Sequence, residues 1–296
     1  MDTRDAYLVD AFTDEPTCGN PAGVVPDADG LDAEQMQALA NELGASETAF
    51  VRSSDEADRQ IRYFTPETEV DLCGHATIAS HALLFEQGVI EAGQHTMETE
   101  AGVLDISISE DGMVWMTQNA PRVRELDVDL GRVAEALGVD PDSISAVGLP
   151  IAWTSTGLPF LAVPIEYFSD LSSLDPDFRA IEALCDEHGA TGIYAFTFDT
   201  LAGDSTLHGR MFAPGAGVDE DPVTGTASGA VGAYLDHQGA LEDTAAMTFE
   251  QGHFLDRPGT VSVSVGAEVK VGGRAVTTLS GSIVVPESDD DEILEA

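Results

Sequence analysis

The order of hydrophobic and polar residues predicts short strands interrupted by a few helices. Residues 6–12 and 49–51 have the apolar character of strands. Between them, residues 32–44 are predicted to form an amphipathic helix, because apolar side chains recur there at helical spacing. The inward positions of this helix are Met36, Leu39, Ala40 and Leu43.

Residues 103–118 predict a β-hairpin, because two strand-like runs flank a short turn that contains glycine. The strand pattern stops at residues 119–121, which marks a candidate domain boundary. Beyond it, the pattern predicts a helix at 175–187 and strands at 192–199, 247–250, 261–265 and 277–285.

The sequence contains an internal repeat. RYFTP at residues 62–66 matches RMFAP at residues 210–214. Each segment is followed by an acidic loop, three residues longer in the second copy, and then by a glycine that begins a helix of small residues, GHAT at 74–77 and GTAS at 225–228. Such self-similarity indicates two equivalent halves. We expect these halves to face each other across a cleft.

Length and charge narrow the class of protein. The chain has 296 residues, more than one hydrophobic core usually organises, which favours two domains. It carries 54 acidic against 12 basic residues, a formal net charge of -42. Binding to nucleic acid depends mainly on Lys and Arg that neutralise phosphates, so a duplex-binding protein is almost excluded. Anionic membrane surfaces are disfavoured for the same reason.

Cellular location follows from what the chain lacks. Its three cysteines have no spacing typical of a metal site, and an odd number cannot all pair in disulfides. This favours a reducing compartment. The N-terminus has no basic and apolar signal-peptide pattern, and no stretch approaches ~18 apolar residues. We therefore expect a soluble, cytoplasmic protein without a membrane partner.

The two repeated helix starts are candidate anion sites. Glycine and small residues let a ligand approach the first helical turn, where unpaired N–H groups and the helix dipole favour a negative charge. Gly74 and Gly225 also suit close helix packing, which is the alternative explanation. Their duplication favours binding of a carboxylate without lysine or arginine.

Three polar residues lie near these helix starts. His75, just inside the first helix, suits a neutral donor or acceptor, and Asp221 precedes the second helix, held in extended geometry by Pro222. Glu47 comes immediately before an apolar strand and is a candidate base that later returns its proton as an acid. His75 and His81 lie on different helix faces, so we expect no metal site.

Several motifs together resemble those of the PhzF family, the phenazine-biosynthesis isomerase-like proteins, and they span most of the chain. They are DAFT at 10–13, GNPAGVV at 19–25, SETAFV at 46–51, RYFTP at 62–66, DLCGHATIA at 71–79, EDPVTGTASG at 220–229, QG at 251–252 and RP at 257–258.

The resemblance implies the diaminopimelate epimerase-like α+β fold, with two pseudo-symmetric domains that each curl a β-sheet around a central helix. Residues 1–118 with 277–296 are expected to form the first domain, and residues 119–276 the second. The resemblance also implies a homodimer that uses neither a metal nor another cofactor, and an active site between the domains.

By motif, Glu47 matches the family's catalytic acid/base, with His75 and Asp221 as its polar partners. Gly74 and Thr226 match positions whose backbone amides hold the substrate carboxylate, and Thr226 replaces a serine often found there. The predicted substrate-binding residues are Asn20, Gly74, Gly225 and Thr226.

Related epimerases of this fold use two cysteines, one before each helix. Here the first position is Cys73 and its repeat partner is Thr224, whose hydroxyl is too weak an acid to mirror a thiol. We therefore expect a cofactor-independent isomerase that shifts a proton on a small carboxylic acid with Glu47. Two alternatives stay open: an amino-acid racemase or epimerase that uses Cys73, and a module that binds a carboxylate without chemistry.

The acidic composition generates a prediction about salt. Acidic side chains on a surface repel one another, and concentrated salt screens that repulsion within about 3 Å at 1 M. With a single lysine, Lys270, the chain is predicted to work in a high-salt cytoplasm. We expect the free energy of unfolding to rise with KCl concentration in denaturant titrations. A stability that does not change with KCl would indicate an ordinary acidic protein.

Overall fold

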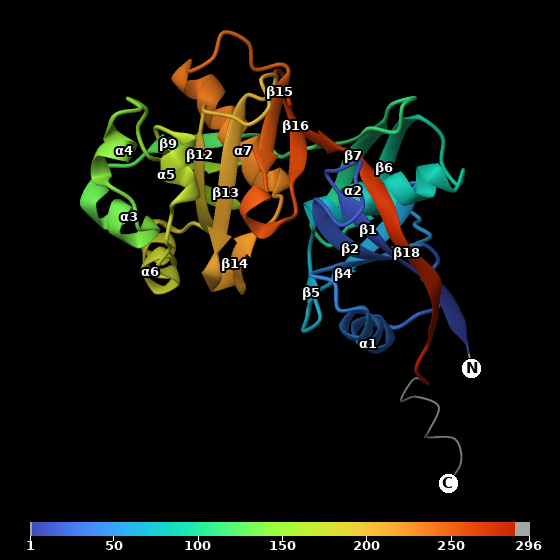
Figure 1. Ribbon diagram of the computed structural model, residues 1–296. Coiled ribbons are helices and arrows are strands. Elements are labelled where there is room, and N and C mark those ends of the chain that lie inside the picture. The colour runs from blue at the N-terminus through green and yellow to red at the C-terminus, as the bar shows by residue number, and fades with distance from the viewer. Residues whose placement is uncertain (1, 288–296) are drawn as a thin grey trace. The chain divides into compact units, whose positions relative to one another are not determined.

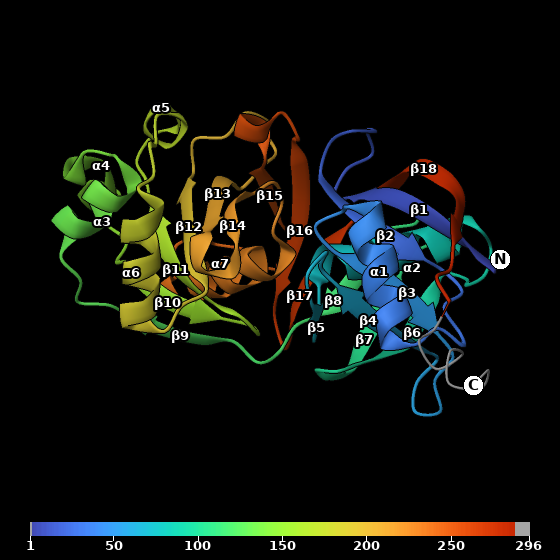
Figure 2. The ribbon, with the colours of Figure 1, turned by 90° about the horizontal axis from the view of Figure 1, so that it is seen from below.

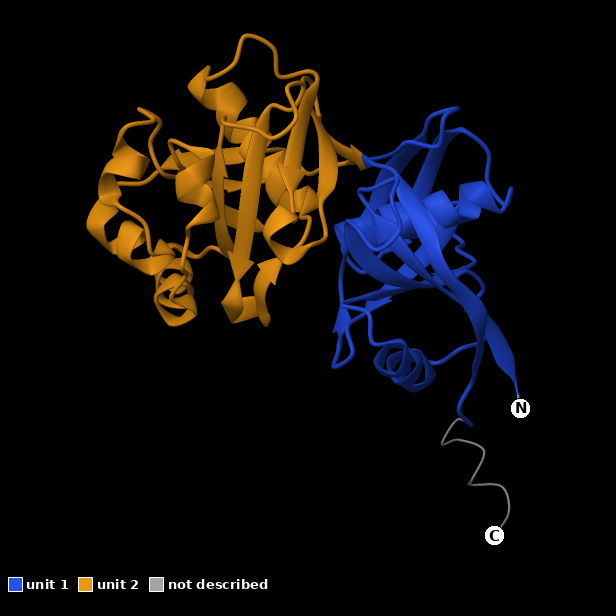
Figure 3. Cartoon of the chain, in the orientation of Figure 1, with its two compact units in different colours: residues 1–116, 273–296 blue, residues 117–272 orange. Residues whose placement is uncertain are grey.

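The computed structural model describes residues 2–287 (Figure 1). The chain divides into two compact units, unit 1 with residues 1–116 and 273–296 and unit 2 with residues 117–272 (Figure 3). The boundaries predicted from the sequence, after residues 118 and 276, lie two and four residues further along the chain. Unit 1 is discontinuous because the last strand of the chain returns to it.

Unit 1 consists of a β-sheet, one central helix and one outer helix. Its elements are β1 (Thr3–Ala11), β2 (Asn20–Val25), α1 (Ala33–Leu43), β3 (Thr48–Arg52), β4 (Arg59–Phe64), β5 (Glu69–Val70), α2 (Gly74–Glu86), β6 (Gly93–Thr99), β7 (Gly102–Ile108), β8 (Val114–Thr117) and β18 (Ala275–Val284). The sheet order is β18-β1-β2-β3-β4-β6-β7-β8, with β5 paired to β4. Only the β2–β3 and β4–β6 pairs are parallel among these.

Unit 2 contains a larger set of helices around a similar sheet. Its elements are β9 (Arg122–Glu125), α3 (Leu130–Leu137), α4 (Pro141–Ser145), β10 (Ala152–Ser155), β11 (Pro159–Pro164), α5 (Phe168–Ser172), α6 (Phe178–His188), β12 (Gly192–Thr197), β13 (Leu207–Ala213), η1 (Pro214–Ala216), β14 (Val218–Asp221), α7 (Gly225–Gln238), β15 (Met247–Gln251), η2 (His253–Leu255), β16 (Gly259–Val265) and β17 (Val269–Gly273).

The sheet of unit 2 repeats the order of unit 1. Its strands run β9-β10-β11-β12-β13-β15-β16-β17, with β14 paired to β13, and the parallel pairs β11–β12 and β13–β15 take the same places. The longer second loop contains the 3-10 turn η1 and the four-residue strand β14, where unit 1 has the two-residue strand β5. The internal repeat read from the sequence is therefore confirmed.

Each sheet is wrapped around one helix that has no separate polar face, α2 in unit 1 and α7 in unit 2 (Figures 1 and 2). Ten residues are buried in each of these two helices. A helix without a polar face has to be covered around its whole circumference. Curling of the sheet around it satisfies this requirement.

Further helices cover the outer face of each sheet. The outer helix α1 buries Met36 and Leu39 against Phe50 and Phe64 of the sheet. In unit 2, α3 and α6 form a corresponding layer over β12 and β13 (Figure 2). Since β12 lies between α7 and α6, all its residues are buried and its sequence does not alternate.

The repeated arginine has the same role in both units. The guanidinium of Arg62 makes two hydrogen bonds to the carboxylate of Glu69, at 2.6 and 2.7 Å. That of Arg210 makes two to Glu220, at 2.9 and 2.8 Å. Such bidentate pairs are the strong form of ion pair. Each pair ties the strand of the RxFxP motif to the short strand that precedes the central helix.

Most predicted elements are present, with shifted ends. Helix α1 runs between an Asp32 capping box and Gly44 in the left-handed conformation, as its sequence indicates. The first strand ends one residue earlier than predicted, because Phe12 has φ 66° and leaves the extended conformation. The helix predicted from residue 175 begins at Phe178, since the Asp177 side chain accepts the Arg179 and Ala180 amides. In the described residues, none of the helices has the length and apolar content needed to cross a bilayer.

A buried histidine in α2 generates a prediction about acid stability. Burial lowers the pKa of His81 from 6.5 to about 4, and its Nδ1 lies 2.9 Å from the Thr77 carbonyl oxygen. Between these two values the unfolded chain binds the proton and the folded chain does not, so the free energy of unfolding falls as the pH falls. This histidine contributes a slope of about 1 kcal/mol per pH unit.

We expect the loss of stability between pH 6.5 and 4 to be smaller in His81→Gln than in the unchanged protein. Denaturant titration across this range measures it. The matched control is His237→Gln, which changes an exposed histidine of α7. Identical pH profiles for His81→Gln and the unchanged protein would contradict the prediction.

Candidate functional site

Glu47 is positioned by the connection between α1 and β3. The left-handed Gly44 ends α1, and the chain turns toward the sheet through a buried Ala45. The carbonyl oxygen of Glu47 accepts a hydrogen bond from Gly23 N at 2.9 Å, which fixes the backbone beside β2. The side chain is 23% exposed, so it is reachable by a ligand and shielded from most solvent.

His75 lies beside Glu47 although 28 residues separate them in the sequence. Its Nε2 is 3.3 Å from Oε2 of Glu47 and 3.3 Å from Oγ of Ser46. Its Nδ1 is 3.4 Å from Sγ of Cys73, the residue that precedes α2. The His75 side chain is 10% exposed. A carboxylate, an imidazole and a thiol are thus gathered at the N-terminus of the central helix of unit 1.

Asn20 belongs to the same end of this sheet. It is the first residue of β2 and is 1% exposed. The next residue, Pro21, accepts a hydrogen bond from the Ser46 hydroxyl at 3.4 Å. Unit 1 therefore brings together Glu47, Gly74 and His75 from the predicted set, and Asn20 precedes the Pro21 that contacts Ser46.

Unit 2 places Asp221 at the end of β14, just before α7. Its carboxylate accepts a hydrogen bond from the hydroxyl of Thr224. Gln251 spans both residues: its Nε2 donates to the Asp221 carbonyl oxygen at 2.8 Å, and its Oε1 accepts from Thr224 N at 3.1 Å. Gln251 is buried, and it holds the loop before α7 in one conformation.

Residues from two other segments also contact or adjoin the start of α7. The Thr156 hydroxyl donates to the Thr226 carbonyl oxygen at 3.4 Å. The neighbouring Gly252 has φ 86°, and a Cβ there would lie 2.2 Å from the Arg257 carbonyl oxygen. Only glycine fits this backbone conformation and this space. Unit 2 therefore brings together Asp221, Gly225 and Thr226 from the predicted set.

Both helix starts are suited to a negative charge. Neither α2 nor α7 has a side-chain cap at its N-terminus, and neither carries an acidic residue in its first turn. The first amides of an α-helix have no carbonyl partner within the helix, and the helix dipole adds a partial positive charge there. In a chain with net charge -42, these two turns are local regions where an anion is favoured.

The acid–base groups are distributed unequally between the repeats. In the strand pairing, Thr48 lies opposite Phe64 and Ile193 opposite Phe212, the equivalent position of the repeat. Glu47 therefore corresponds to Gly192. A Cβ at Gly192 would lie 2.4 Å from a backbone oxygen, so this position admits no side chain.

The same asymmetry holds at the helix starts. Since Gly74 corresponds to Gly225, Cys73 corresponds to Thr224 and His75 to Thr226. Threonine hydroxyls do not accept or release protons near neutral pH, unlike a carboxylate, imidazole or thiol. At these equivalent positions unit 1 therefore has a carboxylate, a thiol and an imidazole, and unit 2 has a glycine and two threonines.

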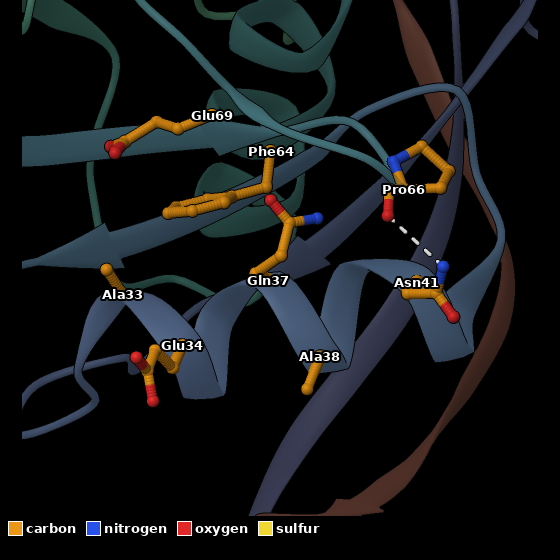
Figure 4. Close-up of a pocket in the computed structure, with 8 residues that line it drawn as sticks. All are labelled: Ala33, Glu34, Gln37, Ala38, Asn41, Phe64, Pro66 and Glu69. Carbon is orange, nitrogen blue, oxygen red and sulfur yellow. Dashed lines mark hydrogen bonds between the residues drawn. The ribbon is translucent and has the colours of Figure 1, made fainter.

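A surface cavity of about 610 Å³ in unit 1 lies apart from these groups (Figure 4). It is open between α1 and the β4–β5 connection, and the Asn41 amide closes one end by donating to the Pro66 carbonyl oxygen at 3.1 Å. None of the predicted site residues lines it. Its lining residues are Ala33, Glu34, Gln37, Ala38, Asn41, Phe64, Pro66 and Glu69.

Three residues gain a role that the sequence did not assign. Ser46 contacts His75, Gln251 fixes the loop of Asp221, and Thr156 contacts the start of α7. Ser46 and Gln251 lie within the quoted motifs SETAFV and QG, so the motifs themselves were a signal. No pattern marked Thr156, which approaches α7 only through folding.

A family model described as "Phenazine biosynthesis-like protein" matches residues 9–281. The chain belongs to the PhzF family. It is similar to the "Uncharacterized isomerase YfhB" of Bacillus subtilis, with 38% identity over 97% of this chain and 98% of that protein. The resemblance seen in the motifs is thereby confirmed, and the protein is a PhzF-like isomerase.

Solved structures support the same assignment. A PhzF-family protein of Bacillus anthracis superposes with a TM-score of 0.88 and 35% identity, covering 96% of this chain and 100% of that one. A hydroxyproline epimerase of Agrobacterium vitis shares the fold, with a TM-score of 0.60, 15% identity and coverage of 96% and 91%. The predicted diaminopimelate epimerase-like fold of this PhzF-family chain is confirmed.

Proposed function

We propose that this protein is a cofactor-independent isomerase in which Glu47 removes a proton from a small carboxylic acid and returns it at another position. The observation that carries the proposal is the unequal distribution of acid–base groups between the two repeats. Glu47 has a glycine as its counterpart, and Cys73 and His75 have threonines. A single base that moves a proton along one face of the substrate fits this pattern better than two opposed bases.

His75 supports Glu47 in this scheme. With its Nε2 at 3.3 Å from the Glu47 carboxylate, the imidazole of His75 holds that carboxylate in place and can form a hydrogen bond with a polar group of the substrate. The uncapped start of α2 offers backbone N–H groups for a substrate carboxylate, including that of Gly74. A small carboxylic acid is the substrate class that these groups favour.

The assignment of Asp221, Gly225 and Thr226 to the same substrate stays a prediction, as does that of Asn20. The hydrogen bonds that Gln251 and Thr224 make in the loop of Asp221 support this assignment. Homodimer formation, a cytoplasmic location and independence of cofactors also stay predictions. Sedimentation analysis tests the first of these.

Replacement of the base tests the proposal. We expect Glu47→Gln to lower the rate of solvent deuterium incorporation by about 10² to 10⁴-fold, the usual contribution of a positioned acid/base. The measurement is a screen of hydroxy, amino and unsaturated acids in D₂O by mass spectrometry. Glu42→Gln, which makes the same change at an exposed position of α1, is the matched control and should keep the full rate. Unchanged turnover in Glu47→Gln would refute the proposed role.

A racemase or epimerase is the second candidate, because the Cys73 thiol lies 3.4 Å from Nδ1 of His75. Under the single-base proposal, Cys73→Ser keeps most of the deuterium incorporation, within about 10-fold, because Glu47 still moves the proton. Exchange at a substrate α-carbon that disappears in Cys73→Ser would instead favour the racemase. Calorimetric binding of an acid without any exchange would favour a module that only binds.

A further inference from the structure

We propose that Ser46 is a positioning residue, whose hydroxyl keeps a hydrogen on Nε2 of His75 and so prevents the imidazole from taking the proton that Glu47 carries. This inference rests on the proposed function, because it concerns the same base. Oγ of Ser46 lies 3.3 Å from Nε2 of His75 and 3.4 Å from the Pro21 carbonyl oxygen. The two contacts form a short chain of hydrogen bonds from the imidazole to the backbone of β2.

The direction of these two hydrogen bonds follows from what each group can donate. A carbonyl oxygen only accepts, so the bond to Pro21 uses the single proton of the Ser46 hydroxyl. Toward His75 the hydroxyl then offers only lone pairs, and the ring nitrogen has to be the donor. The His75 ring therefore carries a hydrogen on Nε2, the nitrogen that also lies 3.3 Å from Oε2 of Glu47.

Glu47 favours the same tautomer of the ring only while it is ionised. An ionised carboxylate accepts hydrogen bonds and donates none, so it too favours a hydrogen on Nε2. Once Glu47 has taken up a proton, its O–H is a donor, and a bare Nε2 at 3.3 Å would accept that proton. The Ser46 hydroxyl donates to Pro21 in both states of Glu47, so it keeps the hydrogen on Nε2 throughout the cycle.

Return of the proton to the substrate is the functional consequence. The proton leaves a substrate carbon while the bonding pair stays on the substrate, is held by Glu47, and returns to another carbon, so no other reactant is consumed. An imidazole with a bare Nε2 would draw off this proton and exchange it with solvent. An imidazole that already carries a hydrogen on Nε2 leaves the substrate as the acceptor.

The repeat supplies an internal comparison. Thr191 of unit 2 corresponds to Ser46, since it precedes the counterpart of Glu47. The parallel registers of β2–β3 and β11–β12 make Pro159 the counterpart of Pro21. In unit 2 this carbonyl oxygen accepts the backbone N–H of Thr191 at 2.7 Å, and the start of α7 has a threonine in place of the imidazole. The side-chain hydroxyl is thus bonded to this carbonyl in the unit that has the imidazole.

Nitrogen NMR of the ¹⁵N-histidine-labelled full chain tests the tautomer without any substrate, and His75→Gln assigns the His75 signals. Glu47→Gln imitates the protonated acid, because its amide is neutral and can donate. We expect the Nε2–H tautomer to predominate in the unchanged protein, in Ser46→Ala and in Glu47→Gln. In the double variant Ser46→Ala/Glu47→Gln, the ratio of Nδ1–H to Nε2–H should rise roughly 2- to 10-fold over Glu47→Gln, the usual worth of one hydrogen bond.

Two further variants in the Glu47→Gln background serve as controls. Ser46→Thr keeps a hydroxyl and should restore the Nε2–H tautomer. Ser145→Ala, which removes an exposed hydroxyl that donates to a backbone carbonyl oxygen in α4, should change nothing. Ser46 is exposed, so its replacement leaves the packing of unit 1 intact. A double variant that keeps the tautomer ratio of Glu47→Gln, or a Glu47→Gln protein in which Nδ1–H predominates, would overturn the proposal.

Proton return is measured with the acid that the deuterium screen identifies, carrying deuterium at the exchanging carbon and turned over in H₂O. We expect the product to retain roughly 2- to 10-fold less deuterium with Ser46→Ala than with the unchanged protein, and Ser46→Thr to restore retention. Equal retention in Ser46→Ala would overturn the role of Ser46 in proton return. Unchanged turnover in Glu47→Gln would instead refute the proposed function, and the NMR result would still decide whether Ser46 holds His75.

Discussion

The central helices α2 and α7 have no separate polar face and are buried along most of their length, and the rest of each unit follows from covering them. A flat sheet covers only one side of such a helix, so the sheet curls, and outer helices cover its other face. The same burial also determines where a ligand can reach the central helix. A helix enclosed along its sides is approached by a ligand at its end, where the first amides have no partner in the helix.

The two units share their structural features but differ in the side chains at the start of the central helix. Both copies keep the bidentate Arg–Glu pair, the uncapped glycine start and the order of strands. Both also hold the first turn with a hydroxyl that donates to the carbonyl four residues back, Thr77 to Cys73 and Ser228 to Thr224. The groups that exchange protons differ. Packing imposes the shared features on both copies, whereas the carboxylate, thiol and imidazole of Glu47, Cys73 and His75 have a glycine and two threonines as their counterparts in unit 2.

The acidic composition is compatible with the proposed carboxylic acid substrate because charge acts locally. Surface carboxylates are screened within a Debye length, about 8 Å at physiological ionic strength. The first turns of α2 and α7 carry no acid of their own, and Arg62 and Arg210 are already committed to Glu69 and Glu220. Attraction for a carboxylate then comes from backbone N–H groups, which a change of surface composition does not remove.

The sequence by itself determined the elements with strong local signals, the repeat and the family. Helix α1 was predictable because its apolar spacing, Asp32 cap and Gly44 end all agree, and Glu47, His75 and Asp221 were named because their motifs are local. Strands such as β9 and β17 were missed because their short runs carry little pattern, and element ends shifted where a cap or a positive φ decided them.

Only the tertiary structure decided which side chains meet. Glu47 and His75 come from different elements, so their 3.3 Å separation is set by how β3 lies against α2 and not by spacing along the chain. The same holds for the equivalence of Glu47 and Gly192, which depends on strand register, and for the clamp that Gln251 makes on Asp221. Local patterns encode elements, whereas contacts between distant segments depend on the packing of the whole unit.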